Sequence, residues 1–156
     1  MRSTRVFAGV ALACIAAVGA ALVTQHVFNM QPCPWCVLQR LIFLAIALAC
    51  IVALICRSAA GRFIGGGIGF VLALCGVAAA LWQHFKAAAS ASCNLTLADK
   101  IVSGTLHLDE LLPNVFSPRA SCADAAVNLF GIPYDFWSLA LFVLIAIALL
   151  RSFSAR

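Results

Sequence analysis

Charged residues are scarce in this sequence. They make up 10% of the 156 residues and only five are acidic, whereas 65% of the residues are hydrophobic. Soluble domains carry about 25% charged residues, so this composition excludes an ordinary water-soluble protein. The low charge and the long apolar runs together predict an integral membrane protein.

The sequence also lacks a basic cluster and a phosphate-binding loop. Its ten Lys and Arg residues give a formal net charge of +5, but they stand singly between hydrophobic blocks. Nucleic-acid binding needs a continuous basic face, so we expect no nucleic-acid partner. The glycines in 65–76 form no complete GxGxxG after a strand, which excludes a dinucleotide-binding loop of that type.

Four apolar segments have about the length of membrane-spanning helices. We expect helices at about 6–25, 37–56, 63–85 and 134–150, in a single membrane domain that covers 1–156. The first segment could instead be a cleaved signal peptide, but its apolar run exceeds the roughly 7–15 residues of a signal core. The sequence therefore predicts an all-α integral membrane protein built as a bundle of four transmembrane helices.

Two loops join these helices on one side, a short loop at 26–36 and a large loop at 86–133, which holds four of the five acidic residues. The apolar residues within 106–116 could lie on the membrane surface or pack on the helices. The other side is flanked by arginines with no acid among them, namely Arg2, Arg5, Arg57, Arg62, Arg151 and Arg156. By the positive-inside rule both termini are cytoplasmic and both loops face the periplasm, as in a bacterial inner-membrane protein.

The eight cysteines divide into two groups of four. One group lies inside apolar runs, where cysteine behaves as a small hydrophobic residue: Cys14, Cys50, Cys56 and Cys75. In the other group, Cys33 and Cys36 form a Cys-x-x-Cys pair at the start of the second segment, and Cys93 and Cys122 lie in the large loop. The predicted topology places this second group in the oxidising periplasm, where disulfides persist.

A Cys-x-x-Cys pair at a helix start suits reversible disulfide chemistry, because the helix dipole and the unpaired amides favour a thiolate. Pro34 suits the first helical position. Arg40 follows Cys36 by one turn on the same face and could stabilise a thiolate or another anion, or it could instead be an interfacial anchor that snorkels to water. His84, at the end of the third segment, could donate a hydrogen bond to a ligand or simply occupy the interface.

Metal binding is an alternative use of these cysteines. Structural zinc normally needs four ligands, and Cys93 and Cys122 are too far apart in sequence to be a second Cys-x-x-Cys pair. Haem attachment is excluded because Val37, rather than histidine, follows Cys36. We expect no metal and no flavin, and the open alternatives are a cysteine-based metal-binding membrane protein and a structural bundle with two stapling disulfides. The loop cysteines could be a static staple or a mobile redox pair.

Several motifs, in this order along the chain, resemble the disulfide-bond formation protein B (DsbB) family. They are Gln25-His26, the Cys-x-x-Cys followed by Gln39-Arg40, His84, the sequence Leu-Pro-Asn-Val-Phe at 112–116, and Leu-Phe-Gly-Ile-Pro at 129–133 followed by Trp137. The resemblance covers nearly the whole chain. Enzymes of the vitamin K epoxide reductase type share the four-helix plan and the cysteine pairs, but the Gln-Arg and Leu-Pro-x-Val-Phe motifs favour DsbB. The chain departs from the family at Pro34-Trp35, where an aliphatic pair is expected.

The resemblance implies a protein-dithiol:quinone oxidoreductase that re-oxidises a periplasmic DsbA-like oxidase of the thioredoxin fold. It implies that Cys93 forms the mixed disulfide with this partner, that Cys33 exchanges with Cys122, and that Cys36 faces the quinone.

The quinone, ubiquinone or menaquinone, would bind near Arg40 and His84 within the surrounding lipid. A quinone suits the energetics, because DsbA is strongly oxidising at about −120 mV and common dithiols are too reducing to re-oxidise it.

Overall fold

The computed structural model describes residues 2–56, 58–87, 97–121, 123–124 and 128–154. The sequence expectations that concern Arg57, Cys93, Cys122 and Arg156 lie outside these residues.

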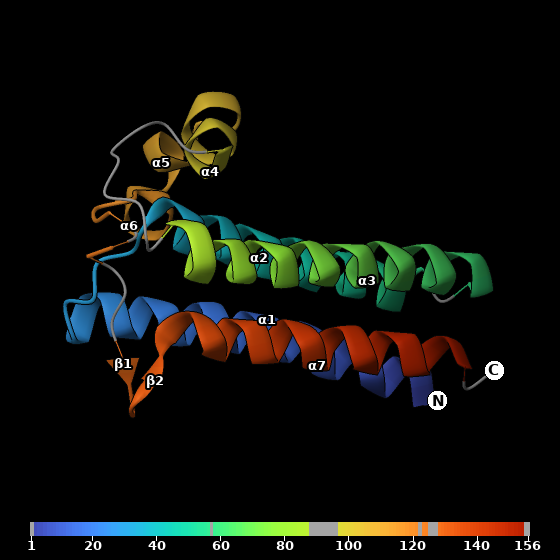
Figure 1. Cartoon of the computed structure of the whole chain (residues 1–156). Coiled ribbons are helices and arrows are strands. Elements are labelled where there is room, and N and C mark those ends of the chain that lie inside the picture. Colours follow the sequence, from blue (N-terminus) through green and yellow to red (C-terminus); the bar gives the residue numbers. More distant parts are fainter. Residues whose placement is uncertain (1, 57, 88–96, 122, 125–127, 155–156) are drawn as a thin grey trace.

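Four long helices form the body of the protein. They are α1 (Arg2–Val27), α2 (Pro34–Ile55), α3 (Ala59–Trp82) and α7 (Tyr134–Ser154). Each is long and apolar enough to cross a membrane, which confirms the expected all-α bundle of four membrane helices. Figure 1 shows α2 and α3 as one layer and α1 and α7 as the other, and each helix packs on two neighbours in the cyclic order α1, α2, α3, α7.

Side-chain caps determine where two of these helices begin. The Cys33 sulfur accepts a hydrogen bond from the amide of Cys36 at the start of α2, and the Ser58 hydroxyl accepts one from the amide of Gly61 at the start of α3. Such caps satisfy amides that have no partner inside the helix. For this reason α2 and α3 begin before residues 37 and 63, where the hydrophobic runs alone would start them.

Glycine lets α3 approach its neighbours closely. A Cβ atom on Gly65 would lie 2.7 Å from Cβ of Ala53 and 2.9 Å from the carbonyl oxygen of Ala49, both on α2. A Cβ atom on Gly76 would overlap the ring of Phe142 on α7. These contacts bear out the close helix packing that small residues allow in membrane bundles.

The short elements gather at one end of the bundle, opposite the two termini (Figure 1). We call this the cysteine end; it is formed by the last turns of α1 and α3 and the first turns of α2 and α7. The short helical elements there are η1 (Gln83–Ala87), a π-helical continuation of α3, then α4 (Leu97–Asp99), η2 (Lys100–Thr105), α5 (Leu108–Leu111) and α6 (Pro113–Phe116). Of these, α4, η2 and α6 pack on α2.

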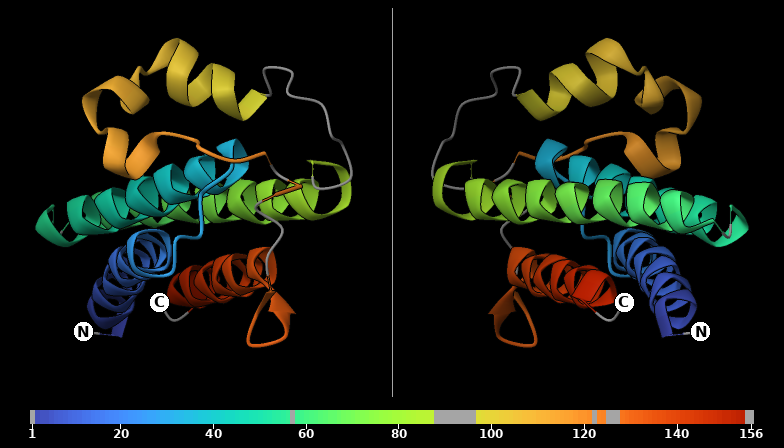
Figure 2. Two further views of the ribbon diagram at one scale, coloured as in Figure 1. Left: turned by 90° about the vertical axis from the view of Figure 1, so that its left-hand side faces the viewer. Right: turned by 90° about the vertical axis from the view of Figure 1, so that its right-hand side faces the viewer.

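The apolar residues of the large loop are divided between the protein and its surroundings. Ala98, Val102 and Phe116 are buried in the core, whereas Leu111 is 71% exposed. A two-stranded antiparallel hairpin, β1 (Asn128–Leu129) and β2 (Ile132–Pro133), then leads directly into α7. Figure 2 shows this hairpin projecting from the flank of the bundle beside α7.

Candidate thiol redox site

The Cys-x-x-Cys pair occupies the first turn of α2. Cys33 is the N-cap, Pro34 opens the helix, and the sulfur atoms of Cys33 and Cys36 lie 2.8 Å apart. A shift of the side chains is therefore enough to join them in a disulfide, whose bond length is about 2.05 Å. Cys33 is fully buried, whereas Cys36 is partly buried and contributes to the wall of a cavity.

Trp35, inside the pair, covers the start of α2. It is 8% exposed, and its ring centroid lies 6.4 Å from that of Trp82 at the end of α3. Pro34 and Trp35 thus supply a helix-starting proline and an aromatic contact between α2 and α3.

Two buried amides reach Cys36 from within the bundle. Gln39 Nε2 donates to Gln83 Oε1 at 2.7 Å, and Gln83 Nε2 donates to the Cys36 sulfur at 3.3 Å. Both glutamines are nearly inaccessible, with exposures of 5% and 6%. A buried amide costs free energy unless it is paired, so this chain of hydrogen bonds fixes both side chains. The Gln83 amide, which donates to the Cys36 sulfur, stabilises negative charge on that sulfur.

Arg40 is buried one turn below Cys36, with 6% of its surface exposed. Its Nη1 donates to Gln25 Oε1 at 2.6 Å and to the carbonyl oxygen of Val115 at 2.9 Å, and its Nη2 donates to the carbonyl oxygen of Ala21 at 3.3 Å. These acceptors come from α1 and α6, so the guanidinium connects α2 to both. All three are uncharged, so the cation keeps its positive charge available to a ligand.

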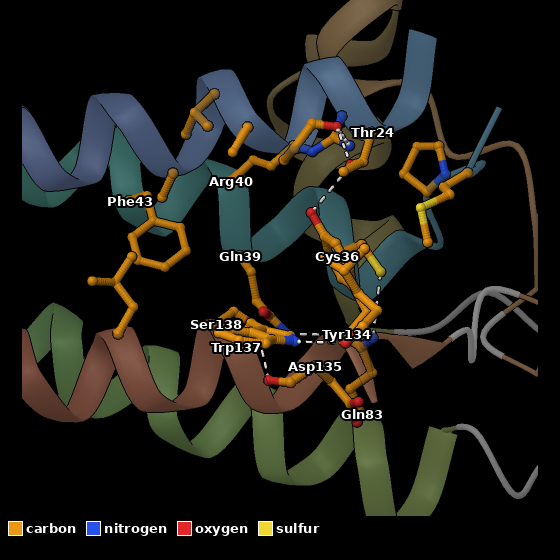
Figure 3. Close-up of a pocket in the computed structure, with 18 of the residues that line it drawn as sticks. Thr24, Cys36, Gln39, Arg40, Phe43, Gln83, Tyr134, Asp135, Trp137 and Ser138 are labelled. Carbon is orange, nitrogen blue, oxygen red and sulfur yellow. Dashed lines mark hydrogen bonds between the residues drawn. The ribbon is translucent and has the colours of Figure 1, made fainter. Parts of the chain in front are cut away.

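A cavity of about 500 Å³ opens beside these groups, and Figure 3 shows Cys36, Gln39, Arg40 and Gln83 around it. Its walls are mainly apolar and come from α1, α2 and α7, with further residues from 30–32, Gln83 and Leu129. Phe43 belongs to the lining, and its ring stacks on that of Phe142 at 4.0 Å between centroids. The cavity is within the size range of small-molecule sites, and its few polar groups gather at the cysteine end.

His84 lies outside the cavity, in contact with a residue of its wall. Its Nδ1 lies 2.8 Å from Oδ2 of Asp135, and its ring packs against Phe85 and Phe136. Asp135 lines the cavity, but His84 is absent from the lining. Within the part of the chain that the structure describes, Asp135 is the residue that connects His84 to the cavity.

The structure brings Cys33, Cys36 and Arg40 together, while Cys93 and Cys122 lie outside the described residues. Within the part of the chain that the structure describes, no three His, Cys, Asp or Glu side chains converge as metal ligands. The geometry is that of a dithiol at the edge of an apolar cavity.

Comparison with known proteins identifies the family. Residues 3–151 match the family described as "Disulfide bond formation protein DsbB". The chain belongs to the DsbB family. Disulfide bond formation protein B of Herminiimonas arsenicoxydans is 34% identical over 154 residues, covering 97% of this chain and 96% of the relative. Disulfide bond formation protein B 1 of Pseudomonas aeruginosa is 34% identical over 136 residues, covering 85% and 83%.

Membership of the DsbB family makes the chain a disulfide-forming oxidoreductase and implies a DsbA-like partner. Its four membrane-length helices make it a multi-pass protein of the bacterial inner membrane. The resemblance seen in the sequence is thereby confirmed, and the vitamin K epoxide reductase alternative is set aside.

Sequence reasoning missed the roles of three side chains at the DsbB site. Gln83 is the donor to Cys36, Gln25 is the acceptor for Arg40, and Asp135 connects His84 to the cavity. The available signal was a polar residue within or at the end of an apolar helix, which is costly unless it has a partner. That signal does not say which residue the partner is.

Proposed function

We propose that this chain passes electrons from the dithiol of a periplasmic thioredoxin-fold oxidase to a membrane quinone, through its Cys33–Cys36 pair. The observation that carries the proposal is the position of the Cys36 sulfur, on the wall of an apolar cavity that also holds Arg40.

The residues of the cavity fit a quinone. Apolar walls suit its ring and isoprenoid tail, and Arg40 and the buried amides supply the hydrogen-bond donors that its carbonyl oxygens need. When bound, a quinone accepts two electrons and two protons to give the quinol. We assign Cys36 to the contact with the quinone, Arg40 to orientation and charge stabilisation, and His84 to a supporting position behind Asp135.

The thiol steps follow disulfide exchange. A partner thiolate attacks the Cys93–Cys122 disulfide and forms a mixed disulfide with Cys93, releasing the Cys122 thiolate. The second partner thiolate then frees Cys93, so the partner becomes oxidised. Cys122 attacks Cys33 in the Cys33–Cys36 disulfide, releasing Cys36 as the thiolate at the cavity wall, and Cys93 then attacks Cys122 to restore the loop disulfide. Each cycle carries two electrons to the inner pair.

Cys33 imposes one condition on this sequence. Cys33 is fully buried, so a partner dithiol in the periplasm cannot attack it directly, and in this proposal the electrons pass through the loop cysteines first. The partner remains outside the membrane throughout, and only the quinone enters the bundle.

We further propose that the cysteine end faces the periplasm and that residues 1–156 act as one membrane domain. Arg5 lies near the start of α1, Arg62 in the first turn of α3 and Arg151 near the end of α7. Figure 1 shows these helix ends at the opposite end of the bundle, where the two termini are found. The positive-inside rule assigns that end to the cytoplasm.

The test is turnover of the chain in lipid vesicles with a reduced thioredoxin-fold oxidase and ubiquinone, followed by loss of quinone absorbance. We expect one quinol per partner disulfide, and menaquinone in a parallel assay identifies the preferred acceptor. Cys93→Ser should prevent the mixed disulfide on a non-reducing gel, while Cys75→Ser, on the exposed side of α3, serves as the matched control. Oxidation of the partner without consumption of quinone would refute the proposal.

A further inference from the structure

The β1–β2 hairpin carries a bulky side chain in a backbone conformation that disfavours it. Leu129 pairs with Ile132, so Phe130 and Gly131 alone make the turn. Their φ angles are +55° and +81°. A two-residue hairpin turn with positive φ at both positions favours Asn-Gly, because asparagine tolerates the left-handed region far better than phenylalanine.

Among the described residues, no contact buries this phenylalanine. Phe130 is 88% exposed, the largest value among the exposed large hydrophobic side chains of the described residues. Ile132 on the second strand is 45% exposed, and the whole segment Asn128–Pro133 contains no charged residue. A soluble hairpin would place a polar residue at such a tip.

The position of the hairpin indicates what covers it. It leads directly into α7, whose membrane-length segment starts at Tyr134. Figures 1 and 2 show the hairpin pointing sideways from the flank of the bundle, at the level of the first turn of α7. That level is the boundary of the membrane, where aromatic side chains are favoured.

We infer that the hairpin is an anchor that inserts Phe130 among the lipid headgroups and the first acyl carbons. The unfavourable φ at Phe130 has no compensating contact within the described protein, and contact with lipid supplies one. The partner is therefore the bilayer surface itself.

The anchor lies at the edge of the cavity. Trp137 Nε1 donates to the carbonyl oxygen of Leu129 at 3.3 Å, and both residues line the cavity, where Figure 3 shows Trp137. The hairpin is thus hydrogen-bonded to the side of α7 that faces the site. The inference about lipid contact does not depend on the redox function proposed above.

The test is tryptophan fluorescence of Phe130→Trp in vesicles. The emission of the wild-type protein is subtracted, so that the difference reports the added tryptophan. The bilayers contain lipids brominated either near the glycerol or near the chain end. We expect blue-shifted added emission, quenched most by the shallow bromines and little by aqueous iodide. Ala123→Trp, at an exposed position of the large loop, is the matched control. Its added emission should be red-shifted, quenched by aqueous iodide and little affected by the brominated lipids.

Red-shifted emission that iodide quenches would overturn the anchor, as would strongest quenching by the deep bromines. If Phe130→Trp folds poorly, Ile132→Trp reports from the second strand, with the same expectations. Phe130→Asn adds a separate check. It should relieve the strained turn and yet weaken association of the hairpin with lipid, seen as faster amide exchange of residues 128–132 in vesicles. Unchanged exchange in this variant would also contradict the inference.

Discussion

Cys36 and Cys50 are the same residue type on the same helix, but their surroundings differ. Cys36 lies in the first turn of α2, lines the cavity and accepts a hydrogen bond from Gln83. Cys50 lies deep in the same helix, is fully buried, and neighbours Gly69 in a group of apolar side chains. Because the residue type is the same, the difference between the two thiols lies in their position along the helix, their access to the cavity and their polar neighbours.

The physical cause lies in the backbone. The first turn of a helix has amides without intrahelical acceptors, and one of them, the Cys36 amide, donates to the Cys33 sulfur. In the middle of the helix every amide is already used by a carbonyl oxygen one turn earlier. A thiolate at Cys50 would therefore have neither solvent nor a donor to stabilise it.

The largest expected effect separates these two cysteines directly. Cys36→Ala should reduce quinone-dependent turnover by about a thousandfold or more, because it removes a reacting sulfur. Cys50→Ala should leave turnover within about twofold and cost only about 1 kcal/mol of stability, through the small space it leaves. Equal losses of turnover in both variants, measured in vesicles, would contradict the comparison.

The next largest effect concerns Arg40, which lies beside Cys36 at the cavity and, among the described residues, has no counterpart beside Cys50. Arg40→Met should raise the quinone KM about ten- to a hundredfold, since a hydrogen bond from a charged donor contributes about 1.5–3 kcal/mol. The rate of mixed-disulfide formation with the partner should stay the same, and Arg40→Lys should restore part of the affinity. Quinone kinetics that do not change would remove Arg40 from the site.

Gly76 probes the apolar middle of the bundle. Gly76→Ala would push the Phe142 ring, and the Phe43 ring stacked on it, toward the cavity. Overpacking of this kind costs about 1–3 kcal/mol, so thermal unfolding in detergent should shift to lower temperature. Gly67→Ala is the matched control, because its Cβ would meet nothing within 4 Å. A stability loss as large in the control would mean that helix distortion, not contact with Phe142, is responsible.

The smallest expected effect concerns the buried amides. Gln83→Leu removes the donor to Cys36 and should slow alkylation of the reduced thiol about fivefold, as expected for one hydrogen bond of about 1 kcal/mol. Gln83→Glu keeps an acceptor for Gln39 but offers Cys36 no amide donor, so it should also slow alkylation while retaining more stability. Alkylation at the wild-type rate in Gln83→Leu would show that this hydrogen bond does not activate the sulfur.

Much of the architecture could be predicted from the sequence, because membrane helices follow from runs of apolar residues. The start of α2 at the Cys-x-x-Cys pair and the close packing at Gly65 rest on local rules of capping and residue size, and the structure confirms both. The family could be predicted because its motifs occur in a fixed order, and the comparisons confirm it.

The partners of the buried polar residues could not be predicted. Gln83 is 47 residues from Cys36 and Val115 is 75 residues from Arg40, so their contacts depend on how the helices and the loop pack. The sequence gives the polar residue and its helix, but not the rotation of that helix about its axis. His84 shows the same difficulty, since its contact with Asp135 depends on how the ends of α3 and α7 pack together.

The location of the dithiol and the cavity at one end of the bundle also determines the electrical character of the reaction. Moving one elementary charge across a membrane costs about 2.3 kcal/mol per 100 mV. A dithiol and a quinone that both react at the same end transfer electrons without carrying charge from one face of the bilayer to the other. Turnover should therefore proceed at the same rate in energised and in fully depolarised vesicles.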